Sequence, residues 1–302
     1  MAENSNAIII LNYNDWNTTA SLVKKIEKYS NISYIIVVDN ASTDESVDQL
    51  KKICNKKVKL CISDCNKGYA YGNNLGCEYA ITNYGVNYIT IANPDIYFTE
   101  ETLERILEEF QKHEENVGIV GCHMICHSNI DLPSAWKLPT YTDCILENLM
   151  LLRRIIGNRT RYDISYNADS PLLVDVIAGS FFTISSEAFK KTGGFDTETF
   201  LYYEENILSK KLNNIGYRNY LIPNIQYDHY HSVSINKTIK TKAKRFKEAQ
   251  KSREYYAIKY LQIGLIRLLF LRIVFYIGLL NYTIVDFLHG LFKNKENTFY
   301  SY

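Results

Sequence analysis

Short apolar runs alternate with longer amphipathic stretches along the first half of the chain. The stretches in which apolar residues recur every three or four positions predict helices, and they cover residues 16–29, 72–83 and 100–112. The apolar runs predict buried strands, and they cover residues 7–11, 34–38, 58–62, 88–92 and 117–121. Strands that alternate with helices in this way are typical of βαβ units, so we expect an α/β fold with a mostly parallel central sheet.

The segment after the second predicted strand carries a helix-start signal. Ser42 is followed three residues later by Glu45, which is the pattern of a capping box. We therefore expect a helix that begins directly after Ser42, with the Ser42 side chain as its N-cap.

The middle of the chain is less regular. Residues 126–170 show weak periodicity and hold a cluster of arginines, so we expect a loop-and-helix insertion there rather than a separate domain. Beyond it, residues 174–184 predict a strand that is broken at Gly179 and Ser180, and residues 204–214 predict a helix.

The last part of the chain, residues 237–302, differs from the rest in charge and hydropathy. It holds thirteen Lys and Arg residues against four Asp and Glu residues. Its longest uncharged run, residues 273–285, has thirteen residues, short of the ~20 that a membrane-spanning helix needs. An apolar helical surface beside basic residues is typical of a segment that lies on an anionic membrane face. Helices packed on the body of the protein or on a second subunit, as in a homodimer, are the alternative.

Composition narrows the class of protein. Of the 302 residues, 46% are hydrophobic and 22% are charged, which is ordinary for a chain with a real core and excludes a disordered regulator. The formal net charge of +1 argues against a nucleic-acid partner. The odd number of cysteines, seven, and the lack of a hydrophobic leader before the first strand predict a reducing, cytoplasmic location. We expect two domains, residues 1–236 and a helical extension over 237–302.

Polar residues follow several of the predicted strands. Asp39, Asn66 and Asp95 each lie just past a strand, at the edge where parallel sheets bind ligands. Asp39 is placed to accept a hydrogen bond from the base or ribose of a nucleotide; the alternative is that it caps local backbone amides. The loop from Asn66 to Gly76 is rich in Gly and Asn and opens a helix, which suits a nucleotide or its phosphates, although a plain surface loop has the same composition.

Three segments with acidic or imidazole side chains could carry chemistry. Pro94 stiffens the Asn93–Asp95 turn, so that Asp95 could hold Mg²⁺ or Mn²⁺; a structural turn is the alternative. Glu204 and Glu205 open a helix roughly 100° apart, so one could orient while the other abstracts a proton, or both could simply favour the helix N-terminus. His229 and His231 share a face of a predicted strand and could serve a metal or a diphosphate. The spacing from Cys122 to His127 does not match a closed zinc site.

Taken together and in this order, these segments resemble the family 2 inverting glycosyltransferases, especially their bacterial rhamnosyltransferase-like branch. The matching segments are Ile10 to Asn14, Val38 to Asp44, Asn66 with Gly68 and Asn74 to Gly76, Asn93 to Asp95, Ala178 to Phe182, Gly193 to Asp196, Tyr203 to Glu205, and His229.

The resemblance implies an A-type glycosyltransferase fold, which is a Rossmann-like, mostly parallel sheet flanked by helices, here with a C-terminal helical extension. It implies that Asp39 binds a pyrimidine base, that Asp95 and His229 hold a divalent metal, Mg²⁺ or Mn²⁺, and that Glu205, beside Glu204, is the catalytic base. The donor-binding residues that it implies are Tyr13, Asp39, Asn66, Gly68, Asn74, Asn93, Asp95, Gly179 and Ser180.

The implied reaction moves rhamnose or a hexose from a dTDP- or UDP-sugar to a glycan or a lipid-linked glycan in cell-surface polysaccharide synthesis. Such acceptors place the enzyme at the inner face of the cell membrane. Two positions depart from the family pattern: Ile207 stands where a further acid is common, and Glu205 is one methylene longer than the usual Asp. A binding scaffold without catalysis and a sugar-phosphate nucleotidyltransferase are the alternatives; the second typically has glycine and basic residues after the first strand, where this chain has Asn12 to Asp15.

Overall fold

The computed structural model of the chain describes residues 5–112, 116–127, 132–149, 152, 155–230 and 242–299. The chain divides into two compact units. The sheet unit comprises Met1–Leu138 and Arg161–Ile235, and the helical unit comprises Pro139–Thr160 and Asn236–Tyr302. Residues 139–160, which were expected within an insertion of the first domain, thus group with the C-terminal helices.

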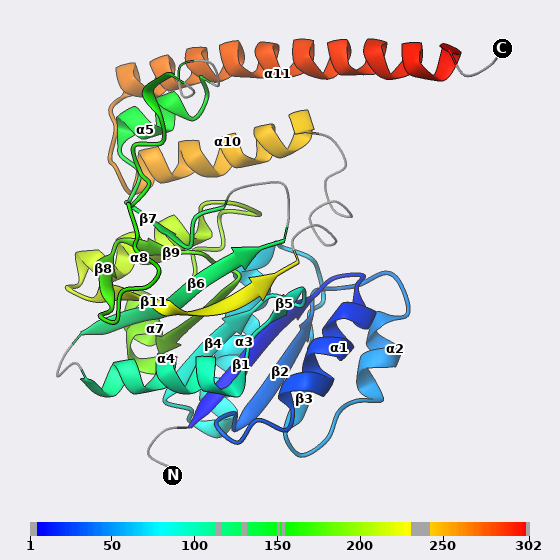
Figure 1. The fold of residues 1–302 in the computed structure, drawn as a ribbon, viewed down its shortest axis with the longest axis vertical. Coiled ribbons are helices and arrows are strands. Elements are labelled where there is room, and N and C mark those ends of the chain that lie inside the picture. Colours follow the sequence, from blue (N-terminus) through cyan, green and yellow to red (C-terminus); the bar gives the residue numbers. More distant parts are fainter. Residues whose placement is uncertain are drawn as a thin grey trace. The chain divides into compact units, whose positions relative to one another are not determined.

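A mixed, mostly parallel sheet forms the centre of the sheet unit (Figure 1). Its strand order is β3-β2-β1-β4-β10-β6-β11-β5, with β8 paired to β11. The pairs β1–β2, β2–β3, β1–β4 and β6–β11 are parallel, whereas β10 runs antiparallel between β4 and β6. The strands are β1 (Asn6–Asn12), β2 (Tyr34–Asp39), β3 (Val58–Ile62), β4 (Tyr88–Ala92), β5 (Ile96–Tyr97), β6 (Val117–Cys126), β8 (Leu172–Val174), β10 (Phe181–Ser185) and β11 (Arg218–His229).

Helices cover both faces of this sheet. Alternate residues of a buried strand point to opposite faces, so that Ile8 and Ile10 of β1 join one apolar cluster and Ala7 and Ile9 join the other. The first cluster includes side chains from α1 (Trp16–Ile26), α2 (Ser46–Lys51) and α4 (Glu100–Lys112). The second includes side chains from α3 (Tyr69–Tyr84), α7 (Ser186–Thr192) and α8 (Glu204–Asn214).

Most of the expected elements are present, with two differences among the strands of the sheet unit. The strand expected over 174–184 is divided into β8, β9 (Val176–Ile177) and β10, and β9 pairs with β7 (Ala135–Trp136) in a separate two-stranded sheet. The strand expected over 117–121 continues to Cys126 and pairs with β11 over its whole length.

The predicted capping box at Ser42 is wrong. Helix α2 begins at Ser46 with Glu45 at the N-cap position and no side-chain cap. The Ser42 hydroxyl instead accepts hydrogen bonds from the backbone amide of Asn14 (2.9 Å) and from Asn12 Nδ2 (3.2 Å). Ser42 therefore connects the loop after β2 to the loop after β1. Its hydroxyl makes these contacts between loops in place of the expected helix cap.

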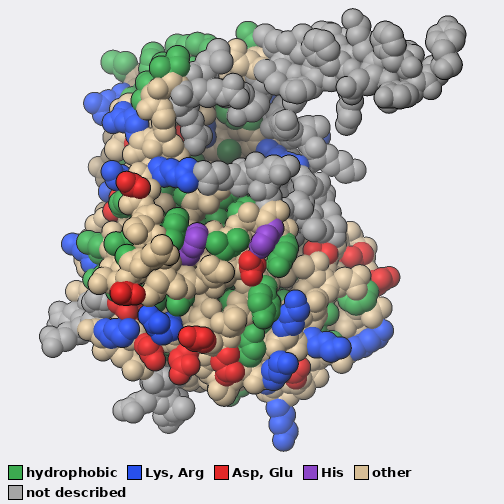
Figure 2. All heavy atoms as spheres, viewed as in Figure 1, with side chains coloured by type: hydrophobic (Ala, Val, Ile, Leu, Met, Phe, Trp, Pro, Cys, Tyr) green, Lys and Arg blue, Asp and Glu red, His purple; other side chains and the backbone are tan. Residues whose placement is uncertain are grey.

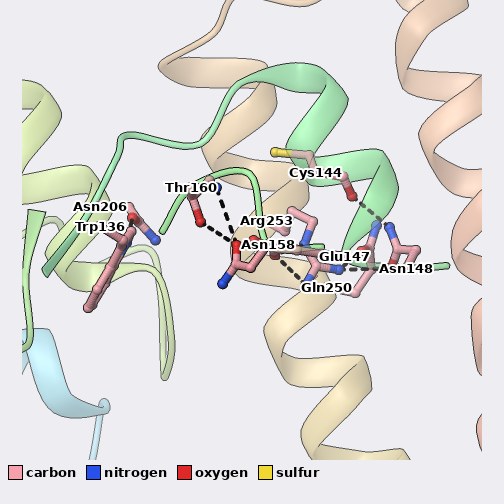
Figure 3. Close-up of polar contacts among 9 residues, drawn as sticks. All are labelled: Trp136, Cys144, Glu147, Asn148, Asn158, Thr160, Asn206, Gln250 and Arg253. Carbon is pink, nitrogen blue, oxygen red and sulfur yellow. Dashed lines mark hydrogen bonds and ion pairs between the residues drawn. The ribbon is translucent and has the colours of Figure 1, made fainter. Parts of the chain in front are cut away.

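The helical unit is built from α5 (Tyr141–Leu146), α10 (Lys242–Lys259) and α11 (Leu265–Phe299). Arg253 of α10 is 5% exposed, and its guanidinium donates to Glu147 Oε2 (2.9 Å), Asn148 Oδ1 (2.8 Å) and Gln250 Oε1 (2.8 Å) (Figure 3). Leu271 and Val274 of α11 are buried. Within the described residues, no helix has the length and apolar character that crossing a membrane requires.

Candidate active site

The carboxyl ends of the parallel strands bring the predicted donor-binding segments to one edge. Asn12 at the end of β1 lies opposite Asp39 at the end of β2, and Ile10 lies opposite Ala92 at the end of β4. Tyr13 follows β1 at this edge and is partly exposed. Three segments far apart in the sequence therefore meet where open α/β sheets bind ligands.

Asp39 is fully buried and both of its carboxylate oxygens contact the protein. Oδ2 accepts from Asn12 Nδ2 (2.8 Å) and Oδ1 accepts from the backbone amide of Ser42 (2.9 Å). Asp39 thus does cap a local amide, as the alternative interpretation held. Each carboxylate oxygen can accept more than one hydrogen bond, so base recognition by Asp39 stays a prediction.

The glycine- and asparagine-rich loop is shaped by its own side chains. Asn66 Oδ1 accepts from the Gly68 amide (3.0 Å) and from Asn40 Nδ2 (3.1 Å). Gly68 has φ +96°, and a Cβ there would meet the carbonyl oxygen of Phe200 at 2.1 Å, so only glycine fits. Asn74, further along α3, exchanges two hydrogen bonds of 2.9 Å with the backbone of Phe195. The donor-binding role of these residues stays a prediction.

Asp95 and His229 lie together. Strand β5 pairs with the end of β11, and the Tyr230 amide donates to the Asp95 carbonyl (2.9 Å). His229 Nε2 is consequently 3.4 Å from Asp95 Oδ1, with side chains 7% and 10% exposed. His231, the other histidine that the sequence singled out, lies outside the described residues.

This pair suits a divalent cation that is shared with a ligand. Carboxylate oxygen and imidazole nitrogen are both accepted by Mn²⁺, and carboxylate oxygen by Mg²⁺. Across the part of the chain that the structure describes, no three His, Cys, Asp or Glu side chains gather as a metal cluster. A cation at Asp95 and His229 would thus take its remaining ligands from water and phosphate oxygens, which is how Mg²⁺ is usually held at phosphates.

Glu205 lies against the backbone of the β9–β10 connection. A Cβ on Gly179 would fall 2.3 Å from Glu205 Oε1, so the carboxylate occupies the space that glycine leaves. Burial raises the pKa of Glu205, while the backbone amides of Glu205 and Gly179, which donate to the carboxylate, lower it. Gly179 therefore both admits and holds the acid that the resemblance assigns as the base.

The adjacent Glu204 is in a different environment. It is 3% exposed, whereas Glu205 is partly exposed. Burial and then the Glu205 carboxylate raise the pKa of Glu204 well above its usual value. Among the described residues, Glu204 Oε1 has no hydrogen-bond partner, although the backbone amides of Glu204 and Tyr202 act on the carboxylate and lower its pKa. The structure thus separates the two acids, with Glu204 in the interior and Glu205 toward the surface.

Two of the implied donor-binding residues, Asn93 and Ser180, lie where the end of β4 meets the start of β10. Ser180 is 6% exposed, and its hydroxyl is 2.6 Å from the Tyr227 hydroxyl. The Asn93 amide donates to the Ser180 carbonyl (2.8 Å), which joins the end of β4 to the start of β10. Through this bond the segment before Asp95 and the segment that carries Gly179 are neighbours.

Some contacts at the site were not foreseen from the sequence. The Tyr69 hydroxyl donates to the Gly179 carbonyl (2.7 Å). The Trp136 indole donates to Asn206 Oδ1 (2.7 Å), directly beside Glu205 in the sequence (Figure 3). Both bonds join segments that are far apart along the chain, and no local pattern signals them.

A cavity of about 290 Å³ lies elsewhere in the sheet unit. Its lining includes Asp175, Ser209 and Arg218. Arg218 is the first residue of β11 and His229 is the last, so this cavity is at the opposite end of the strand from the candidate site. In the view of Figure 2, acidic and basic side chains mix over the sheet unit without a large patch of one sign.

The chain is similar to known glycosyltransferases. Residues 7–193 match the model of a protein family described as glycosyl transferase family 2. The chain is 26% identical over 200 residues to the low-salt glycan biosynthesis hexosyltransferase Agl10 of Haloferax volcanii, a match that covers 66% of this chain and 58% of Agl10. It is 25% identical over 227 residues to the rhamnosyltransferase WbbL of Escherichia coli, covering 74% of this chain and 82% of WbbL.

Solved structures share the fold. The mannosyltransferase PcManGT from Pyrobaculum calidifontis, in complex with GDP-Man and Mn²⁺, superposes with a TM-score of 0.57 at 14% identity, covering 86% of this chain and 64% of that one. TarS of S. aureus in complex with UDP-GlcNAc superposes with a TM-score of 0.56 at 14% identity, covering 85% and 67%. At this level of identity the likeness concerns the fold alone.

Proposed function

Because the chain belongs to glycosyl transferase family 2, we propose that it transfers a rhamnosyl or hexosyl group from a pyrimidine nucleotide-sugar to a glycan or lipid-linked glycan, with inversion at the anomeric carbon. The expected family and the expected A-type glycosyltransferase fold are confirmed. The donor, the acceptor, the metal and the stereochemistry are the proposal.

The observation that carries the proposal is the contact between the Glu205 carboxylate and Gly179. The next residue, Ser180, accepts a hydrogen bond from the Asn93 amide, so the Asn93 segment lies beside this contact. A sugar hydroxyl is a weak nucleophile, so a carboxylate must take its proton as it attacks the anomeric carbon. Glu205 is the partly exposed acid of its pair and takes this role. The nucleoside diphosphate leaves in the same displacement, and the anomeric configuration inverts without a covalent intermediate.

Asp95 and His229 would hold a divalent metal, Mg²⁺ or Mn²⁺. Asp95 Oδ1 and His229 Nε2 are 3.4 Å apart, and a carboxylate oxygen and an imidazole nitrogen are suitable ligands for such a cation. When bound, the cation supplies positive charge that neutralises the departing diphosphate. The Mn²⁺ in the mannosyltransferase structure supports this assignment.

The donor assignment combines several observations. WbbL is described as a rhamnosyltransferase and Agl10 as a hexosyltransferase, which supports either class of sugar. The TarS complex contains a uridine nucleotide, whereas the mannosyltransferase complex contains GDP-Man. We favour a pyrimidine donor, with dTDP or UDP as the nucleotide. The buried Asp39 carboxylate at the sheet edge can accept a hydrogen bond from the N3–H group of either base.

The acceptor proposal rests on the helical unit. Apolar side chains recur every three or four residues on one exposed side of α11, and they are Ile266, Leu269, Phe270, Ile273, Tyr276, Ile277 and Leu280. The unit also carries the basic excess of residues 237–302. An exposed apolar stripe on a basic unit fits the surface of an anionic membrane. A second copy would bring the same positive charge, so we favour the inner face of the cell membrane and a lipid-linked acceptor over a homodimer.

A second candidate, a binding scaffold without catalysis, has one observation in its favour. Ile207, which replaces a common family acid, is fully buried, so no acid takes that place. Glu205 is nevertheless present and accessible, which favours the enzyme.

The test compares Glu205→Gln with the wild type. We expect thermal stabilisation of both proteins by dTDP or UDP with Mg²⁺ or Mn²⁺, and donor hydrolysis or transfer that falls by about 10²–10⁴-fold in the variant only. Transfer at the wild-type rate by Glu205→Gln would exclude this base. Stabilisation by purine but not pyrimidine nucleotides would exclude the proposed donor.

A further inference from the structure

Tyr69 connects three segments of the candidate site. It is the first residue of α3, and its hydroxyl donates to the carbonyl oxygen of Gly179 over 2.7 Å. Gly179 in turn lies against the Glu205 carboxylate and donates its amide to it. The Tyr69 phenol thus holds the carbonyl of the residue whose amide donates to the acid.

Tyr69 is itself held on both sides. Its backbone amide donates to the Phe200 carbonyl (3.1 Å), and its ring meets the edge of the Phe195 ring at 6.0 Å between centroids. Phe195 is fixed by its two backbone hydrogen bonds with Asn74. The hydroxyl of Tyr69 therefore has little freedom to leave Gly179.

The Gly179 segment has few other restraints at this point. Residue 179 lies between the short strand β9 and the start of β10, outside both ladders. The Ala178 amide donates to the Ser134 carbonyl (3.0 Å), and the next carbonyl, that of Ser180, accepts from Asn93. Between these two anchors the Tyr69 hydroxyl fixes the carbonyl of Gly179, and so the plane of the peptide that follows.

We propose that Tyr69 is a positioning residue for Glu205: by anchoring Gly179 it sets where the carboxylate of the base lies. The inference rests on the proposed role of Glu205. It assigns Tyr69 a task that differs from lining the nucleotide, which the sequence pattern around Asn66 and Gly68 indicated.

The protonation of Glu205 should depend on this anchor. Burial raises the pKa of Glu205, and hydrogen bonds from its own amide and the Gly179 amide lower it. Three other titratable groups act on Tyr69 or Glu205. They are Glu204 beside the base, Cys77 on α3 and Tyr227 on β11. Burial raises the pKa of the Cys77 thiol and of the Tyr227 phenol, so these two stay neutral at physiological pH. Glu204 is the remaining group whose charge could change.

Tyr69→Phe tests the proposal, because it keeps the ring against Phe195 and removes only the hydroxyl. A freer Gly179 holds the Glu205 carboxylate less well, so the pKa of Glu205 rises and the base is protonated up to a higher pH. We expect the acid limb of the kcat profile to move to higher pH, and transfer below the midpoint to fall about 2- to 12-fold, the equivalent of one hydrogen bond.

A second readout needs no substrate. Carbon-13 NMR of glutamate carboxyl groups, with Glu205→Gln to assign the signal, follows the titration of the Glu204–Glu205 pair in the wild type and in Tyr69→Phe. We expect the Glu205 signal to titrate at higher pH in the variant. Failure of transfer in the wild type would count against the proposed function, whereas this titration would still decide the role of Tyr69.

Tyr29→Phe is the matched control. The Tyr29 hydroxyl donates to the Phe98 carbonyl (2.9 Å), which is the same type of bond elsewhere in the sheet unit. Both variants should lose similar thermal stability, and only Tyr69→Phe should shift the acid limb and the carboxyl titration. Identical profiles for Tyr69→Phe and the wild type would overturn the proposal and leave Tyr69 a structural residue.

Discussion

The imidazole of His229 lies 3.4 Å from the carboxylate of Asp95, although one residue ends the last strand of the sheet and the other follows β4. The pairing of β5 with β11 creates this neighbourhood. We propose that this pair binds a cation whose other ligands come from a nucleotide.

The first prediction concerns the Asp95–His229 pair. Asp95→Asn and His229→Gln keep the size of each side chain and weaken its hold on a cation. We expect each variant to need about tenfold or more Mn²⁺ for half-maximal transfer, and chelation to abolish transfer by the wild type. The measurement is activity against free Mn²⁺. An unchanged Mn²⁺ requirement in both variants would remove Asp95 and His229 from the metal site.

The second prediction concerns Gly179. A Cβ at this position would lie 2.3 Å from Glu205 Oε1 and 2.8 Å from its Cγ, so Gly179→Ala forces the carboxylate to move. We expect a folded protein whose transfer rate is about 100-fold lower, since a misplacement of about 1 Å has that effect on catalysis. Circular dichroism checks that the variant is folded, and initial rates measure its transfer activity.

Gly264→Ala is the control for that change, because a Cβ at Gly264 meets nothing within 4 Å. It should leave the rate unchanged. A Gly179→Ala protein as active as Gly264→Ala would show that the position of Glu205 does not matter to the reaction.

The third prediction concerns pH and stability. Burial and the Glu205 carboxylate raise the pKa of Glu204 well above its usual value. Below the ordinary pKa both the folded and the unfolded chain are protonated at Glu204, and stability is full. As pH rises from there to the raised pKa, only the unfolded chain releases the proton, so stability is lost by about 1.4 kcal/mol per pH unit.

Glu204→Gln removes this loss. The melting temperature of the variant, relative to that of the wild type, should therefore increase as the pH is raised from about 4 to 7. A shift of a few degrees is expected for a chain of this size. A difference that stays constant with pH would contradict the burial of a protonated Glu204.

The fourth prediction concerns the exposed stripe on α11. Replacing Ile266, Ile273 and Leu280 by Ser removes side chains that are 85%, 57% and 61% exposed, so the fold should be retained. Binding to vesicles of equal parts phosphatidylcholine and phosphatidylglycerol should fall at least tenfold, because each buried apolar side chain contributes about 1.5–3 kcal/mol. Leu173→Ser, at a 58% exposed position of the sheet unit, is the control.

Co-sedimentation with vesicles measures this binding, and light scattering measures the oligomeric state. A wild-type protein that ignores anionic vesicles and forms a dimer, which the triple variant loses, would assign the stripe to a second copy instead.

The fifth prediction concerns Arg253. Its side chain is 6% exposed, and its partner Glu147 is 24% exposed, so Arg253→Met leaves a partly buried carboxylate and the Asn148 amide without their donor. We expect a loss of about 2–3 kcal/mol in the unfolding free energy, somewhat less than for a fully buried pair. Arg272→Met breaks a pair with Glu254 in which Arg272 is 50% exposed, and should change stability by less than about 1 kcal/mol. Chemical denaturation monitored by circular dichroism compares them, and equal losses would contradict the role of burial.

The sequence predicts best where periodicity is strong and local. The strand over 88–92 and the helices over 100–112 and 204–214 have the predicted bounds, because their apolar residues repeat regularly between turn residues. Residues 139–160 have no such pattern. They group with α10 and α11 through contacts such as Glu147 with Arg253, which no local signal announces.

The site divides along the same line. The ends of β1, β2 and β4 meet as the parallel pattern predicts, because strand direction fixes which edge they share. The capping box failed at Ser42, where the hydroxyl bonds Asn12 and Asn14 from another loop. Tyr69 was part of a recognised loop, yet its bond to Gly179 could be found only in three dimensions.

The antiparallel strand β10 has a consequence for how the protein is made. It separates β4 from β6, which in the chain are divided only by the short strand β5 and by α4, and its ladder with β4 starts at Phe181 opposite Ala92. On the ribosome, the first three parallel strands and β4 can pair early, but β6 has no neighbour in the sheet until the chain has been synthesised beyond residue 181. Assembly of the edge that holds Gly179, Glu205 and His229 thus requires contacts of long sequence separation, which form slowly. Nascent chains that stop short of that point would present the unpaired side of β4 to other polypeptides.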